Sequence, residues 1–321
     1  MGHATTGTLN TAQYNTGIGL GTLQAITSGD NNTANGYQAL YSNTTASNNT
    51  ATGYAALRTN TTGNYNTAHG SYTLYSNTTA SNNTATGYYT LFSNTTGSSN
   101  SANGSYALFS NTTGYKNTAT GFEALYGITS GWYNSALGYL AGQDITTGSN
   151  NTCIGYDAQP TSATVSNEIT LGNSSIATLR AQVTSITALS DRRDKTEIKN
   201  ISEGIEFVKK LNPVTFTWNM RDKGKVGIKS AGFIAQDLLA LQNYSKIGKN
   251  LALVNASNPE RLEAQYGNLL PVLVKAIQEL SAQNETQKKL NELQQKQIER
   301  QQNELTELKK SINNSQESAK K

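Results

Sequence analysis

The stretch Asn49-Thr50-Ala51-Thr52-Gly53-Tyr54-Ala55-Ala56-Leu57 decides the fold, because close variants of it recur throughout the first half of the chain. In most copies an Asn stands four residues before the glycine and a Leu four residues after it. A short fixed period of this kind is typical of repeat architectures and has to be recognised before single strands are assigned. The glycines follow one another at intervals of 17 residues: Gly19, Gly36, Gly53, Gly70, Gly87, Gly104, Gly121, Gly138, Gly155 and Gly172.

Small and polar residues alternate within each copy, which is the two-residue period of a β-strand. Seventeen residues are too few for a pair of helices, but they suit one coil of a β-solenoid with two strands of four to five residues and two turns. Asn and Gly are expected at the corners, because both tolerate left-handed backbone conformations. We therefore predict a β-solenoid shaft over residues 1–172, followed by a stem or linker over residues 173–189.

Charge separates this shaft from the rest of the 321-residue chain. Residues 1–172 carry two basic and five acidic side chains, whereas residues 173–321 carry 23 basic and 16 acidic ones. With one Cys and two His, a zinc site or a Ser-His-Asp triad is not expected. No run of about 18 apolar residues is present, and the N-terminus lacks the apolar segment of a secretory signal. We expect no cofactor, no metal, no nucleic-acid partner and no membrane insertion.

Three groups of shaft residues have plain structural interpretations. Cys153 takes the position of a repeat Ala, so it is expected to be a small buried side chain rather than a nucleophile. His69 takes an outward position before Gly70 and is expected to be solvated. A glycan-degrading site would need paired carboxylates. The acidic residues of the shaft lie in different coils: Asp30, Glu123, Asp144, Asp157 and Glu168.

The core of the shaft is expected to be thin, because its inward positions hold mainly Ala and Leu. One Leu and two Ala contribute only a few kcal/mol at about 25 cal/mol per Å². Ordering each backbone residue costs about 1–2 kcal/mol. Aromatic residues follow most repeat glycines, and 15 of the 17 Tyr lie in this half. An aromatic row indicates packing against other copies in a homotrimer or another parallel oligomer. The alternative is a single-chain solenoid whose aromatic stripe binds glycans.

The recurring Asn-Thr-Ala-x-Gly signature resembles the head repeats of trimeric autotransporter adhesins and the repeat shafts of phage fibres. Beyond the shaft, helical spacing over residues 204–211 ends at Asn212-Pro213. Residues 214–218 then alternate as a strand, and residues 232–239 have the pattern of a strand end that leads into a helix. We predict a small α+β domain over residues 190–281.

Four motifs in order make this region similar to a known family. They are Ser190-Asp191-x-x-x-Lys195, Leu211-Asn212-Pro213-Val214-x-Phe216-x-Trp218, Gly232-Phe233-Ile234-Ala235-Gln236, and Tyr266 to Leu280. The series resembles the C-terminal intramolecular chaperone of phage tail spikes and tail fibres, the autoproteolytic domain of the endosialidase type. The resemblance implies that the domain helps three chains to trimerise and then releases itself.

The same resemblance implies the site residues. Ser190 is the nucleophile, Lys195 is the base, and the cleaved bond joins Leu189 to Ser190. The chemistry is reasonable, because a serine hydroxyl needs a nearby base and a desolvated lysine amine can supply one. Attack on the preceding carbonyl would give an ester that water resolves, in a single-turnover serine endopeptidase reaction. Asp191 is expected to fix the local turn. The alternative is that Ser190-Asp191 merely caps a turn within a solvated run of charges.

A heptad pattern marks the end of the chain, and we predict a coiled coil over residues 282–321. The repeat intervals alternate between four and three, which places one seam toward a partner helix. The centre of the seam consists of Asn and Gln, which weakens a coiled coil but constrains its register. The seam residues are Leu273, Ile277, Leu280, Asn284, Gln287, Asn291, Gln294, Ile298, Gln301, Leu305, Leu308 and Ile312.

Together these features predict a structural segment of a viral tail fibre or spike, present in the virion and made in the host cytoplasm. The C-terminal chaperone would drive homotrimer assembly and then detach by autoproteolysis. A host surface glycan or protein receptor is the expected partner of the shaft. The alternative is a bacterial or prophage-encoded trimeric surface adhesin with the same assembly domain.

Overall fold

A computed structural model of the chain describes residues 11–176, 178–180, 190–221 and 226–318. The chain divides into two compact units, and each is described by itself. The first contains the repeat half of the chain, which we call the shaft. The second contains most of the region after residue 190, and we call it the C-terminal unit.

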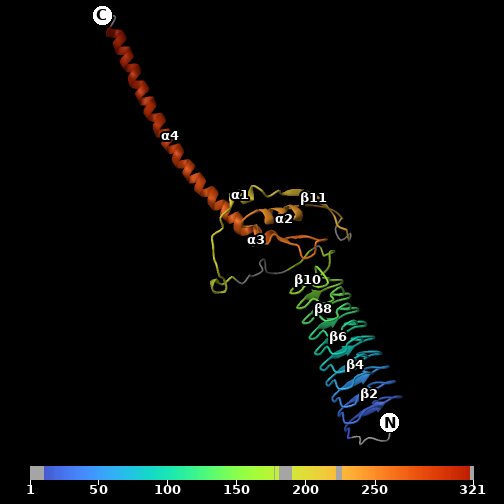
Figure 1. Cartoon of the computed structure of the whole chain (residues 1–321). Coiled ribbons are helices and arrows are strands. Elements are labelled where there is room, and N and C mark those ends of the chain that lie inside the picture. The colour runs from blue at the N-terminus through green and yellow to red at the C-terminus, as the bar shows by residue number, and fades with distance from the viewer. Residues whose placement is uncertain (1–10, 177, 181–189, 222–225, 319–321) are drawn as a thin grey trace. The chain divides into compact units, whose positions relative to one another are not determined.

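The shaft is a β-solenoid in which each coil adds one short strand to a ten-stranded parallel sheet (Figure 1). Residues 17 positions apart pair directly, as in Ala68 with Ala85, so the predicted repeat is confirmed. The predicted pair of four- to five-residue strands per coil is wrong, because each coil has one three-residue strand. The strands are β1 (Thr16–Ile18), β2 (Thr33–Asn35), β3 (Thr50–Thr52), β4 (Thr67–His69), β5 (Thr84–Thr86), β6 (Ser101–Asn103), β7 (Thr118–Thr120), β8 (Ser135–Leu137), β9 (Thr152–Ile154) and β10 (Ile169–Leu171).

Left-handed backbone residues form the bends between the strands. In one coil Gly87 has φ 133°, Tyr89 φ 55° and the buried Leu91 φ 51°. The left-handed conformation costs a non-glycine residue of order 1–3 kcal/mol. The hydrogen bond from the Leu91 amide to the Ala107 carbonyl of the next coil, at 3.0 Å, helps to hold Leu91 in this conformation. The expectation that Asn and Gly occupy these bends is therefore only partly right, since Leu and Tyr share them.

The repeat glycines are required by space as well as by conformation. Gly138 has φ 138°, and a Cβ added there would lie 2.5 Å from the carbonyl oxygen of Gly155 in the next coil. A side chain at this position would therefore force neighbouring coils apart. This close approach explains why the glycine is kept in each repeat while the residues around it vary.

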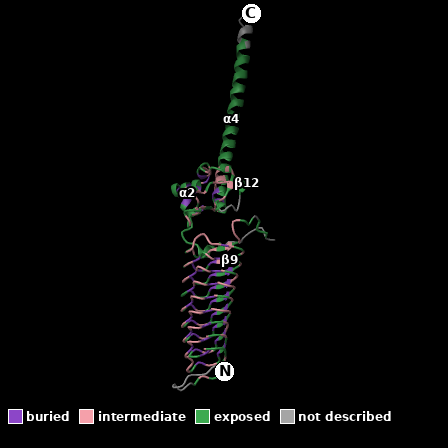
Figure 2. Ribbon diagram, turned by 90° about the vertical axis from the view of Figure 1, so that its right-hand side faces the viewer, coloured by how far each residue is buried: buried purple, intermediate pink, exposed green. Residues whose placement is uncertain are grey.

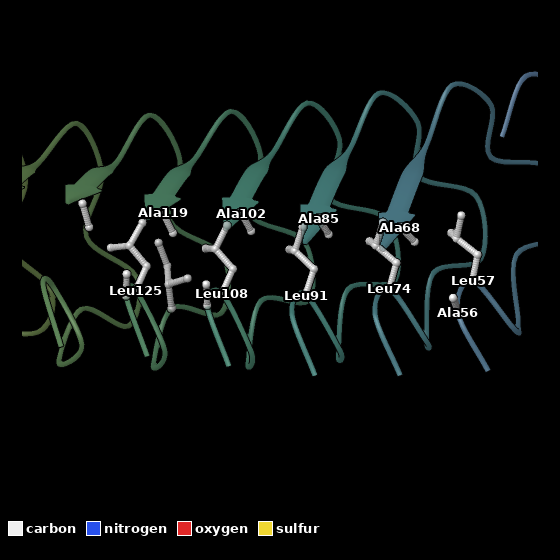
Figure 3. Close-up of a cluster of buried hydrophobic side chains, with 14 of the residues drawn as sticks. Ala56, Leu57, Ala68, Leu74, Ala85, Leu91, Ala102, Leu108, Ala119 and Leu125 are labelled. Atoms are coloured by element: carbon white, nitrogen blue, oxygen red, sulfur yellow. The ribbon is translucent and has the colours of Figure 1, made fainter. Parts of the chain in front are cut away.

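Alanine and leucine form a continuous core along the shaft (Figure 3). In β2 to β8 the central Ala faces inward, and the Leu of the following bend stacks on the Leu of the next coil. Cys153 is 1% exposed in the Ala position, and His69 is exposed, as expected for both. Figure 2 shows the buried residues as a band within the shaft.

Two ladders of buried asparagines run beside this core. In the first, the Asn66 side-chain carbonyl accepts the Asn83 amide at 3.0 Å, and the Asn66 Nδ2 donates to the Ala80 carbonyl. In the second, each Nδ2 donates to the preceding Oδ1, as from Asn77 to Asn60 at 2.8 Å. The ladders satisfy polar groups that would otherwise be buried without partners. These asparagines therefore belong to the core rather than to the left-handed bends.

The second ladder ends at Asn111, whose Oδ1 is buried without a hydrogen-bond partner. The next coil has Ile128 at the position of the ladder Asn, and the coil after it has Ile145. Both isoleucines are fully buried. The shaft core thus changes from amide to aliphatic at this point, and one unpaired acceptor marks the change.

Aromatic side chains line the shaft in two neighbouring columns. In the first column Tyr72, Tyr89 and Tyr106 stack at centroid distances of 4.8 and 5.7 Å. In the second, Phe92 stacks on Phe109 at 5.4 Å. Contacts within one chain thus account for part of the aromatic row that the sequence shows. Rings along the columns are nevertheless partly exposed, among them Tyr54, Tyr88 and Tyr139 at 45–49%.

The chain after residue 190 contains short helices and strands followed by one long helix, and all of it except residues 218–228 belongs to the C-terminal unit. In chain order they are the 3₁₀ turn η1 (Arg192–Asp194), α1 (Ile205–Val208), β11 (Val214–Asn219), β12 (Val226–Gly232), α2 (Ala235–Tyr244), α3 (Gly248–Leu251), β13 (Val254–Asn255), β14 (Glu263–Ala264), η2 (Tyr266–Leu269) and α4 (Leu270–Ser318). β11 pairs with β12, and β13 pairs antiparallel with β14. The predicted small α+β region and long C-terminal helix are confirmed.

A compact apolar cluster joins α1, α2 and the start of α4. Three of its members are fully buried: Phe207, Leu253 and Val272. Beyond this cluster α4 continues alone, and every side chain that the structure describes from residue 281 onward is exposed (Figure 2). Within the described parts of the chain, no helix combines the length and apolar character needed to cross a membrane.

Candidate active site

A short turn at the start of the C-terminal unit carries the two predicted catalytic residues. Asp191 precedes η1 and accepts a hydrogen bond from the Arg193 amide at 2.8 Å. The Lys195 amide then donates to the Arg192 carbonyl at 3.2 Å and closes the turn. This is a normal cap for a 3₁₀ turn, in which a carboxylate satisfies an otherwise unpaired amide. The prediction that Asp191 fixes the turn is confirmed.

The turn brings Lys195 back onto Ser190. The Lys195 Nζ donates to the Ser190 Oγ at 2.5 Å, although the two residues are five positions apart in sequence. A nucleophile and its base must lie within hydrogen-bond distance of one another, and this pair does. The geometry is compatible with the predicted chemistry. The catalytic roles of Ser190 and Lys195 remain a prediction.

Both side chains are exposed in the single chain. The expectation of a desolvated lysine is therefore not met by the surroundings that one chain provides. Leu189, the residue expected on the other side of the cleaved bond, lies outside the described residues. The pairing of Ser190 with Lys195 is thus present, but burial of the pair would have to come from further protein surface.

The neighbouring charges are paired with each other. The Arg193 guanidinium contacts the Asp191 carboxylate at 2.5 Å. This hydrogen-bonded contact lowers the pKa of Asp191, and the backbone amide of Arg193 lowers it further. Asp191 therefore stays ionised at neutral pH and is occupied by Arg193. The basic side chain that contacts Ser190 is Lys195.

Two other sequence motifs of the C-terminal unit meet through one side chain. The hydroxyl of Tyr266 accepts the Phe233 amide at 3.1 Å and donates to the Phe233 carbonyl at 3.0 Å. The two rings pack edge to face at 5.6 Å. Gly232 is needed beside them, because a Cβ there would lie 2.7 Å from the Tyr266 hydroxyl. The motifs that identify the region in sequence are therefore a packing unit in the structure.

A carboxylate on the long helix binds the start of α1, which sequence analysis did not anticipate. The Glu279 Oε2 accepts the Ile205 amide at 2.8 Å, and Lys275 lies 3.4 Å from its other oxygen. Gly204 lies so close to α4 that a Cβ there would come within 2.5 Å of the Ala276 amide. The spacing of Lys275 and Glu279 indicates a helical pair, but nothing in the sequence points to Ile205 as their partner.

The described residues hold no group of three or more His, Cys, Asp or Glu side chains placed to bind a metal ion. The candidate chemistry proposed here uses the hydroxyl of Ser190 and the amine of Lys195, which are in contact. Those two residues begin a recognisable domain. Residues 190–247 match the family model described as chaperone of endosialidase.

The match confirms the resemblance and covers the first three of the four motifs, beginning at Ser190 itself. It supports a general role of the chain in assembling a tail fibre or tail spike, with the β-solenoid as the shaft that precedes the chaperone region. Neither a curated protein nor a solved structure matches the chain. The assignment therefore depends on the family match and on the geometry described above.

Proposed function

We propose that the chain is a tail-fibre or tail-spike segment whose C-terminal unit assembles three copies and is then released by cleavage between Leu189 and Ser190. The observation that supports release is the contact between Lys195 Nζ and Ser190 Oγ in the region that matches the endosialidase chaperone. The family match supports assembly of the chain with copies of itself. The virion is the corresponding location.

The proposed reaction balances with groups of the chain and one water molecule. The Ser190 Oγ attacks the Leu189 carbonyl carbon while its proton passes to the unprotonated Lys195 amine. The peptide C–N bond breaks, the proton passes on to the departing Ser190 nitrogen, and an ester joins Leu189 to the Ser190 oxygen. Water then hydrolyses the ester, leaving a Leu189 carboxylate and the original hydroxyl. The shaft keeps Leu189 as its new C-terminus.

Assembly would supply the surroundings that the single chain lacks. A lysine acts as a base only when it gives up its proton, and removal from water favours the neutral amine. Ser190 and Lys195 are exposed in one chain. Packing of three copies around this turn would cover them, so that cleavage follows trimerisation rather than preceding it.

Two surfaces support association of copies. The heptad seam of α4 is exposed, with Ile277 at 67% and Leu308 at 61%. A polar helix that is solvated on all sides has little tertiary packing to stabilise it, whereas a coiled coil buries such a seam. The aromatic columns of the shaft are a second partly exposed surface, with Tyr139 at 49%.

Intact-mass spectrometry of the purified full-length protein tests the cleavage proposal. We expect a shaft fragment ending at Leu189 and a C-terminal fragment beginning at Ser190. Both Ser190→Ala and Lys195→Met should leave the chain intact, because each removes one member of the contacting pair. Ser202→Ala is the matched control, since Ser202 is an exposed serine of the same unit, and it should still be cleaved. An uncleaved wild-type chain, or cleavage unaffected by Ser190→Ala, contradicts the proposal.

A further inference from the structure

One corner of the shaft departs from the repeat in two successive coils. At the two positions before the Asn of the first ladder, several coils carry small polar pairs such as Ser47-Asn48, Ser81-Asn82 and Ser149-Asn150, and two carry a single tyrosine, as in Asn64-Tyr65. The two departing coils carry Tyr115-Lys116 and Trp132-Tyr133 instead. We call these four residues the aromatic corner. Coils with Ser-Asn at the same place make the same hydrogen bond to the neighbouring coil, as from the Asn82 amide to the Asn64 carbonyl at 3.0 Å, so this contact does not require the large side chains.

The aromatic corner is separate from the two aromatic columns. Tyr115 and Lys116 precede strand β7, whereas Phe122 follows it and contacts Tyr106 of the first column at a centroid distance of 6.1 Å. The corner and the columns therefore lie at opposite ends of the same three-residue strand. A surface that covers the columns need not cover the corner, and the corner can have a role of its own.

The rings of the corner are exposed yet held in a defined arrangement. Tyr115 and Trp132 lie parallel, with an interplanar angle of 5° and centroids 5.9 Å apart. They are 39% and 43% exposed. The Tyr133 amide donates to the Tyr115 carbonyl at 3.3 Å, and the Trp132 amide donates to the Ser149 hydroxyl at 3.1 Å. Stacked coils thus fix the backbone under both rings.

A cation and a phenol stand beside this ring pair. The Lys116 Nζ donates to the Tyr133 hydroxyl at 3.0 Å and lies 5.0 Å from the Tyr133 ring centroid. The hydrogen bond to Tyr133 raises the pKa of Lys116, so the ammonium stays charged at neutral pH. Its remaining N–H groups and the phenolic oxygen are available to a ligand, because both side chains are exposed.

From this arrangement we propose that the aromatic corner is a carbohydrate-binding site for a pyranose residue of an oligosaccharide. A pyranose ring has an apolar C–H face and a rim of hydroxyl groups. The C–H face suits the exposed indole and phenol rings, and the hydroxyls suit the Lys116 ammonium and the Tyr133 oxygen. A site with apolar walls and a few placed polar groups is the usual form of a small-ligand site.

The size of the corner favours a sugar over a second copy of the chain. A specific protein interface covers about 800 Å² on each partner. The corner consists of four side chains on two coils, and coils of a parallel sheet lie only about 4.8 Å apart. The inference depends on the shaft alone and is independent of the cleavage reaction, so failure of one leaves the other standing.

The test uses the full-length protein and a variant that restores the repeat. Trp132→Ser with Tyr133→Asn gives this corner the pair found at Ser81-Asn82. The variant coil therefore has a pair of residues that already occurs in a folded coil of the shaft. Tyr65→Asn is the matched control, because Tyr65 occupies the corner position of Tyr133 in another coil and is 63% exposed. Each protein is applied to an array of defined pyranosyl oligosaccharides, with neutral and uronate-containing members. The strongest oligosaccharide is then titrated by calorimetry.

We expect wild type and Tyr65→Asn to bind an oligosaccharide equally, and the double variant to bind at least about tenfold more weakly. A preference for uronate-containing members would indicate that the Lys116 ammonium binds a carboxylate of the ligand. A preference for neutral members would indicate that it binds a hydroxyl. Absence of binding to every member, or equal binding by the double variant, overturns the proposal. A change in the molar mass of the double variant by light scattering also overturns it, because the corner would then be a contact between copies.

Discussion

Tyr266 binds both backbone polar groups of Phe233, accepting from its amide at 3.1 Å and donating to its carbonyl at 3.0 Å. The contact joins the end of β12 to η2, 33 residues later in the chain. It also holds the phenol close to Gly232, where an added Cβ would lie 2.7 Å from the hydroxyl.

Replacing Tyr266 by Phe should lower the free energy of unfolding of the C-terminal unit by about 1 kcal/mol, because two partly exposed hydrogen bonds are lost. Gly232→Ala should cost more, since its Cβ meets the hydroxyl. In the Tyr266→Phe background the same substitution should cost less, because the hydroxyl is absent. Hydrogen exchange of the Phe233 amide and thermal unfolding measure the effects. Strict additivity of the two substitutions would contradict the contact.

Breaking the second asparagine ladder in its middle should destabilise the shaft more than shortening it at its end. Asn77→Leu leaves the Asn60 Oδ1 without its donor and one Asn94 Nδ2 hydrogen without its acceptor, so two buried polar groups lose a partner. Asn111→Leu removes an acceptor that is already unpaired and leaves the Asn94 Oδ1 unpaired in its place. The number of unpaired buried acceptors is therefore unchanged.

The difference between these two variants should be about 1–3 kcal/mol for each of the two buried polar groups that lose a partner in Asn77→Leu. Urea unfolding followed by the near-ultraviolet circular dichroism of the stacked tyrosines measures it. The two substitutions have the same chemistry and equally buried sites, so each controls for the other. Equal stability of the two variants would contradict the role assigned to the ladder.

The period of the shaft could be predicted from sequence, because it depends on features that repeat: glycine where coils approach closely, Ala and Leu where side chains point inward. The role of the ladder asparagines could not. Asn is a common bend residue by local preference. Asn83 is instead fully buried, because its amide finds partners only when Asn66 of the neighbouring coil is stacked beside it. Stacking likewise holds Leu91 in a left-handed conformation that its own preference disfavours.

The candidate site divides in the same way. The order of the motifs indicated Ser190 and Lys195, and the Asp191 cap explains how five residues of chain bring them together. Desolvation of the pair was expected from chemistry, but one chain leaves both residues exposed. Glu279 could not be found from sequence, since it binds the Ile205 amide 74 residues away.

Cys153 should be inert to thiol reagents in the folded shaft. Burial raises its pKa to about 11, and the nearby Glu168 carboxylate adds to the effect, so the reactive thiolate is scarce at neutral pH. Labelling by a disulfide reagent should be slow at pH 8 and rapid in urea. It is the single cysteine of the chain, so Cys153→Ala gives the blank and should fold, since Ala is the usual residue here. Rapid labelling without denaturant would contradict the burial.

Acid should weaken the contact between α1 and α4. The Ile205 amide lowers the pKa of Glu279, the Lys275 ammonium lowers it further, and the Glu206 carboxylate is the like charge nearby. A carboxyl with a depressed pKa in the folded state stabilises the fold above its ordinary pKa of about 4.3 and loses that contribution as the pH falls through the lowered value. Protection of the Ile205 amide from exchange should therefore fall in acid.

Glu279→Gln separates this effect from general acid unfolding. The amide keeps an oxygen for the Ile205 N–H but carries no charge, so protection should be weaker at neutral pH and less dependent on pH than in the wild type. A variant with the same pH profile as the wild type would show that another carboxyl is responsible.

The seam of α4 should decide whether copies associate. Leu305 lies on the heptad seam, whereas Leu293 lies off it, and both are exposed in the single chain at 55% and 67%. Leu305→Lys places one charge in the seam of every copy. It also removes a side chain whose burial contributes roughly 1.5–3 kcal/mol per copy. Leu293→Lys makes the same chemical change outside the seam.

Light scattering across a dilution series should show dissociation of Leu305→Lys at protein concentrations where Leu293→Lys and the wild type remain associated. Because the two substitutions differ only in heptad position, equal behaviour of both would show that the seam does not hold the copies together.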